Sequence, residues 1–126
     1  MPRPVHFEIH SSDPKTAIKF YGYLFGWTFQ RYAPMEYWLV NTGEGEGING
    51  GLMKRLGGGP VDGAAVNAYV VTIGVPSCKD YFEKAKKLGA VVALDLHAIP
   101  DVGWQAYVKD PDGNIVGLHE SDSSAK

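Results

Sequence analysis

The chain has 126 residues and a mass of 13.7 kDa, a length typical of one domain. Its formal net charge is -2 and its sequence pI is about 6.0, so it carries no basic excess that could neutralise a phosphate backbone. We therefore expect no nucleic-acid partner. No apolar run approaches the roughly 20 residues that cross a bilayer, and residues 1–10 lack the apolar segment of a signal peptide. We expect a cytosolic protein that makes no membrane contact.

The first alternating run, VHFEIH at residues 5–10, predicts a strand that is buried on one side only. Phe7 and Ile9 would face the core. The polar side chains that would share the opposite face are His6, Glu8 and His10.

A helix is expected directly after this strand. Asp13 and Pro14 suit the N-cap and the first helical position, and apolar residues then recur at helical spacing as far as Leu24. Gly26 is a suitable stop. Three further short strands are expected at residues 27–32, 37–41 and 48–54.

A glycine-rich stretch at residues 54–68 shows no sustained periodicity and predicts a linker. The earlier pattern then restarts with a strand at 69–75 and a helix between Ser77 and Gly89. Three strands follow at residues 91–94, 105–109 and 114–119, and the terminal SDSSAK segment is expected to fray.

The two halves match when one is displaced by 64 positions along the other, and by 66 near their ends. This repeat predicts two tandem βαβββ modules, at about residues 5–53 and 69–119, within a single domain spanning residues 1–126. The fold class is therefore α+β. We expect a curved mixed sheet with the helices on its outer face.

The polar face of this sheet predicts a concave cup for a small-molecule ligand. Glu8 is the candidate catalytic base, because a carboxylate on a partly apolar concave face can have its pKa raised toward neutrality. His6 is its electrostatic partner. The alternative to a catalytic role is a structural hydrogen bond between His6 and Glu8 that satisfies two polar groups. The remaining expected ligand contacts are His10, Trp38, Thr72, Gly117 and His119.

Trp38 is assigned to the wall of the cup, although its neighbour Tyr37 is also aromatic. Strand alternation allows only one of the two to face the ligand. Packing in the core or at a dimer contact is the other interpretation of these aromatic residues.

Several motifs resemble the vicinal oxygen chelate superfamily, which contains glyoxalase I, bleomycin-resistance proteins and extradiol dioxygenases. The resemblance lies in His6 seven places before Asp13, in AIKFYGYLFGW at residues 17–27, in KKLGA at 86–90 and in VKDPDGNIVGLHE at 108–120. It covers nearly the whole chain and implies the two-module fold and a homodimer.

The resemblance also implies a metal ligand on the first and last strand of each module. Carried over to this chain, those positions are His6, Gly51, Val70 and Gly117, of which only His6 has a side chain that coordinates metals. We therefore expect no metal cofactor. The alternative is a divalent ion at His6, which Glu8 could share across about 6.6 Å of strand, with a third donor such as His119.

We therefore expect a glyoxalase-like protein that binds a small organic molecule and lacks most of the standard metal site. Whether it is an enzyme stays open, and a metal-free reaction would be proton transfer next to a carbonyl, with Glu8 as base. Two alternatives remain: a metal-dependent lyase, isomerase or dioxygenase with a nonstandard site, and a non-catalytic drug-sequestering protein.

Overall fold

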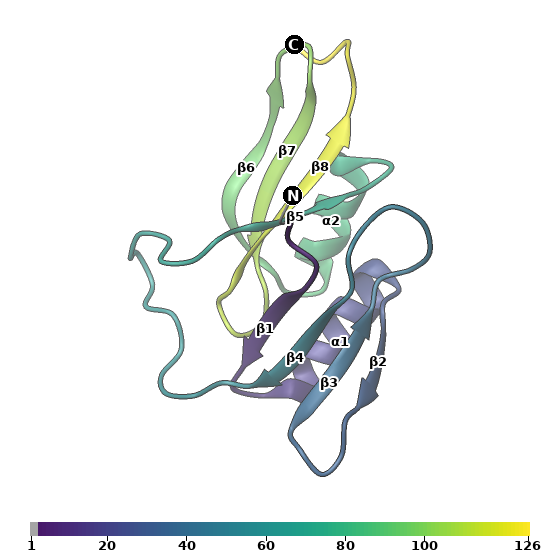
Figure 1. Ribbon diagram of the computed structural model, residues 1–126. Helices are drawn as coiled ribbons and strands as arrows, with labels where there is room; N and C mark the ends of the chain where they lie inside the picture. Colours follow the sequence, from purple (N-terminus) through teal and green to yellow (C-terminus); the bar gives the residue numbers. More distant parts are fainter. Residues whose placement is uncertain (1–2) are drawn as a thin grey trace. The chain divides into compact units, whose positions relative to one another are not determined.

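The computed structural model describes residues 3–126 and divides into two compact units, the first ending at Gly59 and the second beginning at Pro60. Each unit contains one helix and one four-stranded sheet (Figure 1). The boundary falls within the expected glycine-rich linker.

The first unit follows the order β-α-β-β-β. Its elements are β1 (Phe7–Ser11), α1 (Pro14–Phe25), β2 (Thr28–Arg31), β3 (Tyr37–Asn41) and β4 (Gly50–Lys54). The strand order is β1-β4-β3-β2, in which β1 and β4 run parallel and the other neighbours are antiparallel. Strand β4 is therefore an inner strand, between β1 and β3.

The second unit repeats this arrangement. Its elements are β5 (Val71–Gly74), α2 (Cys78–Lys87), β6 (Val91–Ile99), β7 (Gly103–Lys109) and β8 (Ile115–Ser121). The strand order is β5-β8-β7-β6, with β5 and β8 parallel. The α+β class and the βαβββ modules are confirmed, although β6 is longer than expected.

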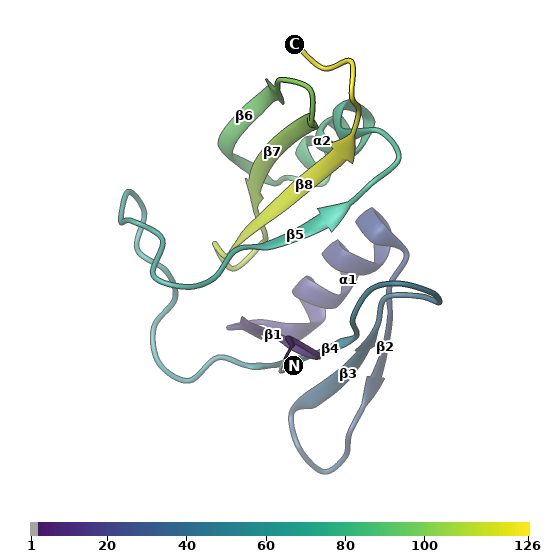
Figure 2. The same ribbon diagram turned by 45° about the horizontal axis from the view of Figure 1, so that its top comes forward.

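Helix α1 covers one face of the first sheet (Figure 2). Leu52 of β4 and Val40 of β3 are fully buried beneath it. Tyr21 of α1 stacks on Trp27, with ring centroids 5.4 Å apart, and Trp27 in turn contacts Phe7 of β1. The expected apolar side of β1 thus faces the helix, which leaves the other side of the sheet for polar residues.

Helix α2 covers one face of the second sheet in the same way. Its first turn is held by two side-chain acceptors: Ser77 accepts from the backbone N–H of Asp80, and Glu120 accepts from that of Cys78 at 2.9 Å. These bonds satisfy donors that a helix start leaves without partners. Within the described part of the chain, no helix is long and apolar enough to cross a membrane.

The C-terminal segment packs against the β6–β7 hairpin, so the expectation that it frays is wrong. Ala125 is only 1% exposed, and its carbonyl accepts the backbone N–H of Asp101. Trp104 of β7 donates its indole N–H to Asp122 at 3.0 Å. Polar composition suggested disorder, but these hydrogen bonds fix the chain.

The core of the first unit generates a stability prediction. Leu52→Ala should lower the free energy of unfolding by about 2–5 kcal/mol, because it leaves a cavity under α1. Urea unfolding followed by tryptophan fluorescence measures the change. Leu56→Ala is the matched control, because Leu56 is 81% exposed and should cost less than about 0.5 kcal/mol. Equal effects of the two substitutions would contradict the assigned core.

Candidate functional site

The strand register defines the side of the first sheet that faces away from α1. Residues paired across neighbouring strands point to the same face, and alternate residues along a strand point to opposite faces. Glu8 is paired with Gly51, and Gly51 with Leu39, so all three lie opposite to Leu52. We call this side the open face. Its strand residues are Glu8, His10, Thr28, Gln30, Tyr37, Leu39, Asn41, Gly51 and Met53.

Tyr37 lies across the inner strand of this sheet. It belongs to β3, whereas its hydroxyl reaches Glu8 of β1 and His6, which directly precedes β1, beyond the intervening β4. Neighbouring strands are about 4.8 Å apart, so the phenol ring must pass over β4 to make these bonds. Gly51 makes this possible, because any side chain at that position would overlap the hydroxyl and ring of Tyr37.

Four side chains form one chain of hydrogen bonds on the open face. The Tyr37 hydroxyl donates to Glu8 Oε2 at 3.2 Å, and His10 Nε2 donates to Glu8 Oε1 at 2.8 Å. His6 Nε2 lies 2.9 Å from the Tyr37 oxygen. Since the single phenolic proton is given to Glu8, the proton in this last bond comes from His6 Nε2. The carboxylate of Glu8 is thus the acceptor on which the network converges.

The hydrogen bonds set the ionisation of the network. The bond from His10, reinforced by the one from Tyr37, lowers the pKa of Glu8 despite an opposing effect of partial burial. Burial and the nearby Glu8 carboxylate raise the pKa of Tyr37. At neutral pH the site therefore holds an ionised carboxylate and a neutral phenol.

The structure brings three of the expected site residues together, with different partners from those expected. Glu8 bonds directly to His10 and Tyr37, whereas His6 bonds to Tyr37. The expectation of a raised pKa for Glu8 is wrong, because the carboxylate remains partly exposed and accepts two hydrogen bonds. The role of Glu8 as a base stays a prediction.

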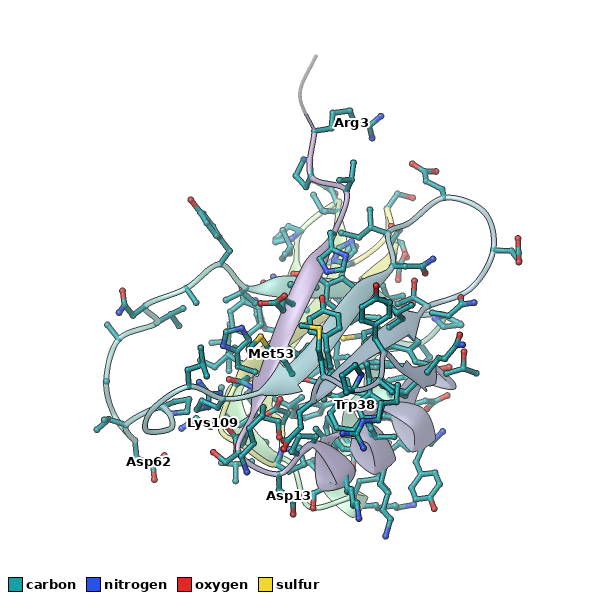
Figure 3. All side chains as sticks on the ribbon, turned by 60° about the horizontal axis from the view of Figure 1, so that its bottom comes forward. Arg3, Asp13, Trp38, Met53, Asp62 and Lys109 are labelled. Atoms are coloured by element: carbon teal, nitrogen blue, oxygen red, sulfur yellow. The ribbon has the colours of Figure 1, made fainter. Side chains whose placement is uncertain are left out.

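Trp38 lies on the other face of the sheet. Its register partners are Leu52 and Arg31, and the Arg31 guanidinium lies over its ring at 5.6 Å. The side chains of Trp38 and Met53 come from the neighbouring strands β3 and β4 (Figure 3). Tyr37 is the aromatic residue on the open face. Its hydrogen bonds to Glu8 and His6 depend on Gly51, a residue of another strand. The alternation within a single strand cannot reveal such a dependence.

The second unit places its expected residues on the corresponding face of its own sheet. Thr72 is paired with Gly117, and His119 lies two residues further along β8. A methyl group added at Gly117 would approach Thr72 Oγ1 to 2.8 Å and the Tyr107 ring to 3.1 Å. Ligand contact by Thr72, Gly117 and His119 stays a prediction.

The chain matches the model of a known protein family. Residues 3–118 match the model of the glyoxalase/bleomycin resistance protein/dioxygenase superfamily. No curated protein sequence matches the chain at a significant level.

Solved structures share the fold at low sequence identity. A glyoxalase/bleomycin resistance protein/dioxygenase family enzyme from Burkholderia phytofirmans aligns with a TM-score of 0.71 and 15% identity, over 93% of this chain and 97% of that one. The fosfomycin resistance protein FosX from Mesorhizobium loti has a TM-score of 0.69 and 16% identity, over 97% and 94%. The trypanothione-dependent glyoxalase I of Leishmania major has a TM-score of 0.68 and 23% identity, over 95% and 87%.

The residues of this chain do not fit the metal ion that the family resemblance implies. At position 51 a glycine offers no ligand, and the phenol of Tyr37 fills the space above it. Glu8 already accepts two hydrogen bonds. Within residues 3–126, no three His, Cys, Asp or Glu side chains are grouped closely enough to hold an ion.

The lowered pKa of Glu8 predicts how stability depends on pH. In the unfolded chain this carboxyl titrates near 4.5, and in the folded chain it titrates lower. Its contribution is therefore present above pH 4.5 and is lost as the pH falls through the folded value. Glu8→Gln should cost less than about 1 kcal/mol at pH 7, because the pair is partly exposed, and still less at pH 3.

Urea unfolding at both pH values measures this difference. Glu36→Gln is the matched control, since Glu36 is an exposed carboxylate of the same unit. A Glu8→Gln deficit that grew on acidification would mean that the carboxylate is not stabilised in the folded protein.

Proposed function

We propose that this chain, which belongs to the glyoxalase/bleomycin resistance protein/dioxygenase superfamily, binds a small, partly apolar organic molecule on the open face. The hydrogen-bond chain from His6 through Tyr37 and Glu8 to His10 carries the proposal. It fixes several polar atoms at one place on a sheet surface, and such fixed groups orient a ligand without being reordered on binding.

The chemistry of the open face favours a neutral or cationic ligand with hydrogen-bond donors. Glu8 is the one carboxylate among the strand residues of this face, which include no Lys or Arg. Each of its oxygens keeps a lone pair after accepting one bond. Leu39, which is 46% exposed, and Met53 offer adjacent apolar surface. An anionic ligand would be repelled by Glu8.

Binding without chemical conversion is the role that the electrostatics support better. A carboxylate whose pKa is lowered is a weaker base, so it is poorly matched to proton abstraction near neutral pH. The similar structures include a fosfomycin resistance protein and a glyoxalase I, so the fold accommodates more than one function.

A homodimer, which the family resemblance implies, and a cytosolic location remain proposals. Light scattering at micromolar concentration tests the first: a mass near 27 kDa, about twice the chain mass of 13.7 kDa, supports a dimer and 13.7 kDa contradicts it.

Three probes with the same ring and different charge test the proposed binding. Benzylamine, benzamide and benzoate are titrated separately while backbone amide shifts are followed by NMR. Benzylamine and benzamide should shift amides of β1, β3 and β4, with benzoate several-fold weaker. Tyr37→Phe removes one hydroxyl from the network and should weaken binding of the first two by about two- to tenfold.

Tyr23→Phe is the matched control, because Tyr23 is an exposed residue of α1. It should leave all three titrations unchanged. Shifts confined to other parts of the chain, or tightest binding by benzoate, would contradict the proposal.

A further inference from the structure

We infer that Tyr37 takes the place of a metal ion on the open face, and that it excludes such an ion by occupying both the space and the partners that the ion would need. Only divalent cations are excluded in this way. The zinc titrations and unfolding measurements described below use no organic ligand. Their outcome is therefore separate from that of the proposed function.

Tyr37 occupies the space above Gly51. A side chain at this position, on the inner strand β4, would begin inside the hydroxyl and ring of Tyr37. A carboxylate or imidazole at position 51 can therefore be accommodated only if Tyr37 moves. The phenol and a ligand side chain at position 51 are mutually exclusive occupants of one volume.

The Tyr37 hydroxyl is bonded to two side chains that could otherwise hold an ion. His6 and Glu8 are two potential metal donors at β1, and the Tyr37 oxygen lies 2.9 Å from His6 Nε2 and 3.2 Å from Glu8 Oε2. A zinc ion held by both would lie about 2.0–2.2 Å from each. The hydroxyl oxygen thus stands between the two donors and satisfies both by hydrogen bonds.

In the second unit the corresponding position is also a glycine, and side chains of neighbouring strands lie close to it. Gly117 lies on β8, which pairs with β5 as β4 pairs with β1. The space at its Cα is bounded by Thr72 and by the ring of Tyr107, a residue of the adjacent strand β7. Both modules therefore set a tyrosine of their third strand beside a glycine of their last strand. The registers differ, because Tyr107 is paired directly with Gly117, whereas Tyr37 is paired with Met53, two residues from Gly51.

A double substitution can replace the Tyr37 phenol by a metal-binding side chain at position 51. Tyr37→Ala combined with Gly51→Glu removes the phenol and adds a carboxylate directly opposite Glu8, its register partner. His6, Glu8 and position 51 then supply three donors on adjacent strands. Calorimetric titration with ZnCl₂ should show one ion bound at least about tenfold more tightly than by the unsubstituted chain, because even outer-shell contacts to a metal ligand change affinity by about 10- to 100-fold.

The matched control is Tyr37→Ala combined with Gly58→Glu. It adds the same charge at an exposed glycine whose added side chain would meet open space. This variant, and the Tyr37→Ala/Gly51→Glu protein carrying His6→Ala, should both lose the tight binding. Zinc binding by the unsubstituted chain that is as tight as in the exchanged variant overturns the inference. So does a folded exchanged variant that binds no better than the Gly58→Glu control.

A smaller substitution keeps the test decisive if the glutamate variants fail to fold. Gly51→Ala should lower the urea midpoint of the first unit, and adding Tyr37→Ala should restore most of that loss, because the clash is with the phenol. Gly58→Ala should leave the midpoint unchanged. Losses that simply add when the first two substitutions are combined would overturn the claim that Tyr37 and a side chain at position 51 compete.

Discussion

The contact between Tyr37 and Gly51 is the constraint on which the candidate site depends. Strand β4 separates the tyrosine from the polar residues of β1, and a side chain at position 51 would block the way. Glycine removes that barrier at an inner position of the sheet, where it usually weakens a strand. The hydroxyl thereby reaches Glu8 and His6, which gives the open face a fixed polar network.

This network also decides what the face can do. Two hydrogen bonds converge on Glu8 and keep it ionised. The carboxylate is therefore held in place before any ligand binds. A site organised in this way is suited to orienting a bound molecule, whereas proton abstraction requires a carboxylate with a higher pKa. The same bonds account for the poor fit of a metal ion, because the groups that would coordinate it already have partners.

Most of the fold could be predicted from local patterns. Alternation identified β1, the spacing of apolar residues identified both helices, and the internal repeat identified the modules. The C-terminal segment was mispredicted, because hydrogen bonds to Asp101 and Val102 fix a sequence that composition alone suggests is disordered. The choice between Tyr37 and Trp38 failed for another reason. Which of two adjacent residues faces outward depends on the register with β4, and sequence alternation does not fix that register.

On the open face, the phenol of Tyr37 stands where a coordinated ion would otherwise lie. A crystal structure of the unsubstituted protein grown with millimolar zinc, with anomalous data collected at the zinc absorption edge, tests it most directly. We expect the Tyr37 ring over Gly51, its hydroxyl bonded to His6 and Glu8, and no anomalous peak between those two side chains. A zinc ion coordinated by His6, with the tyrosine turned away from Gly51, would contradict it.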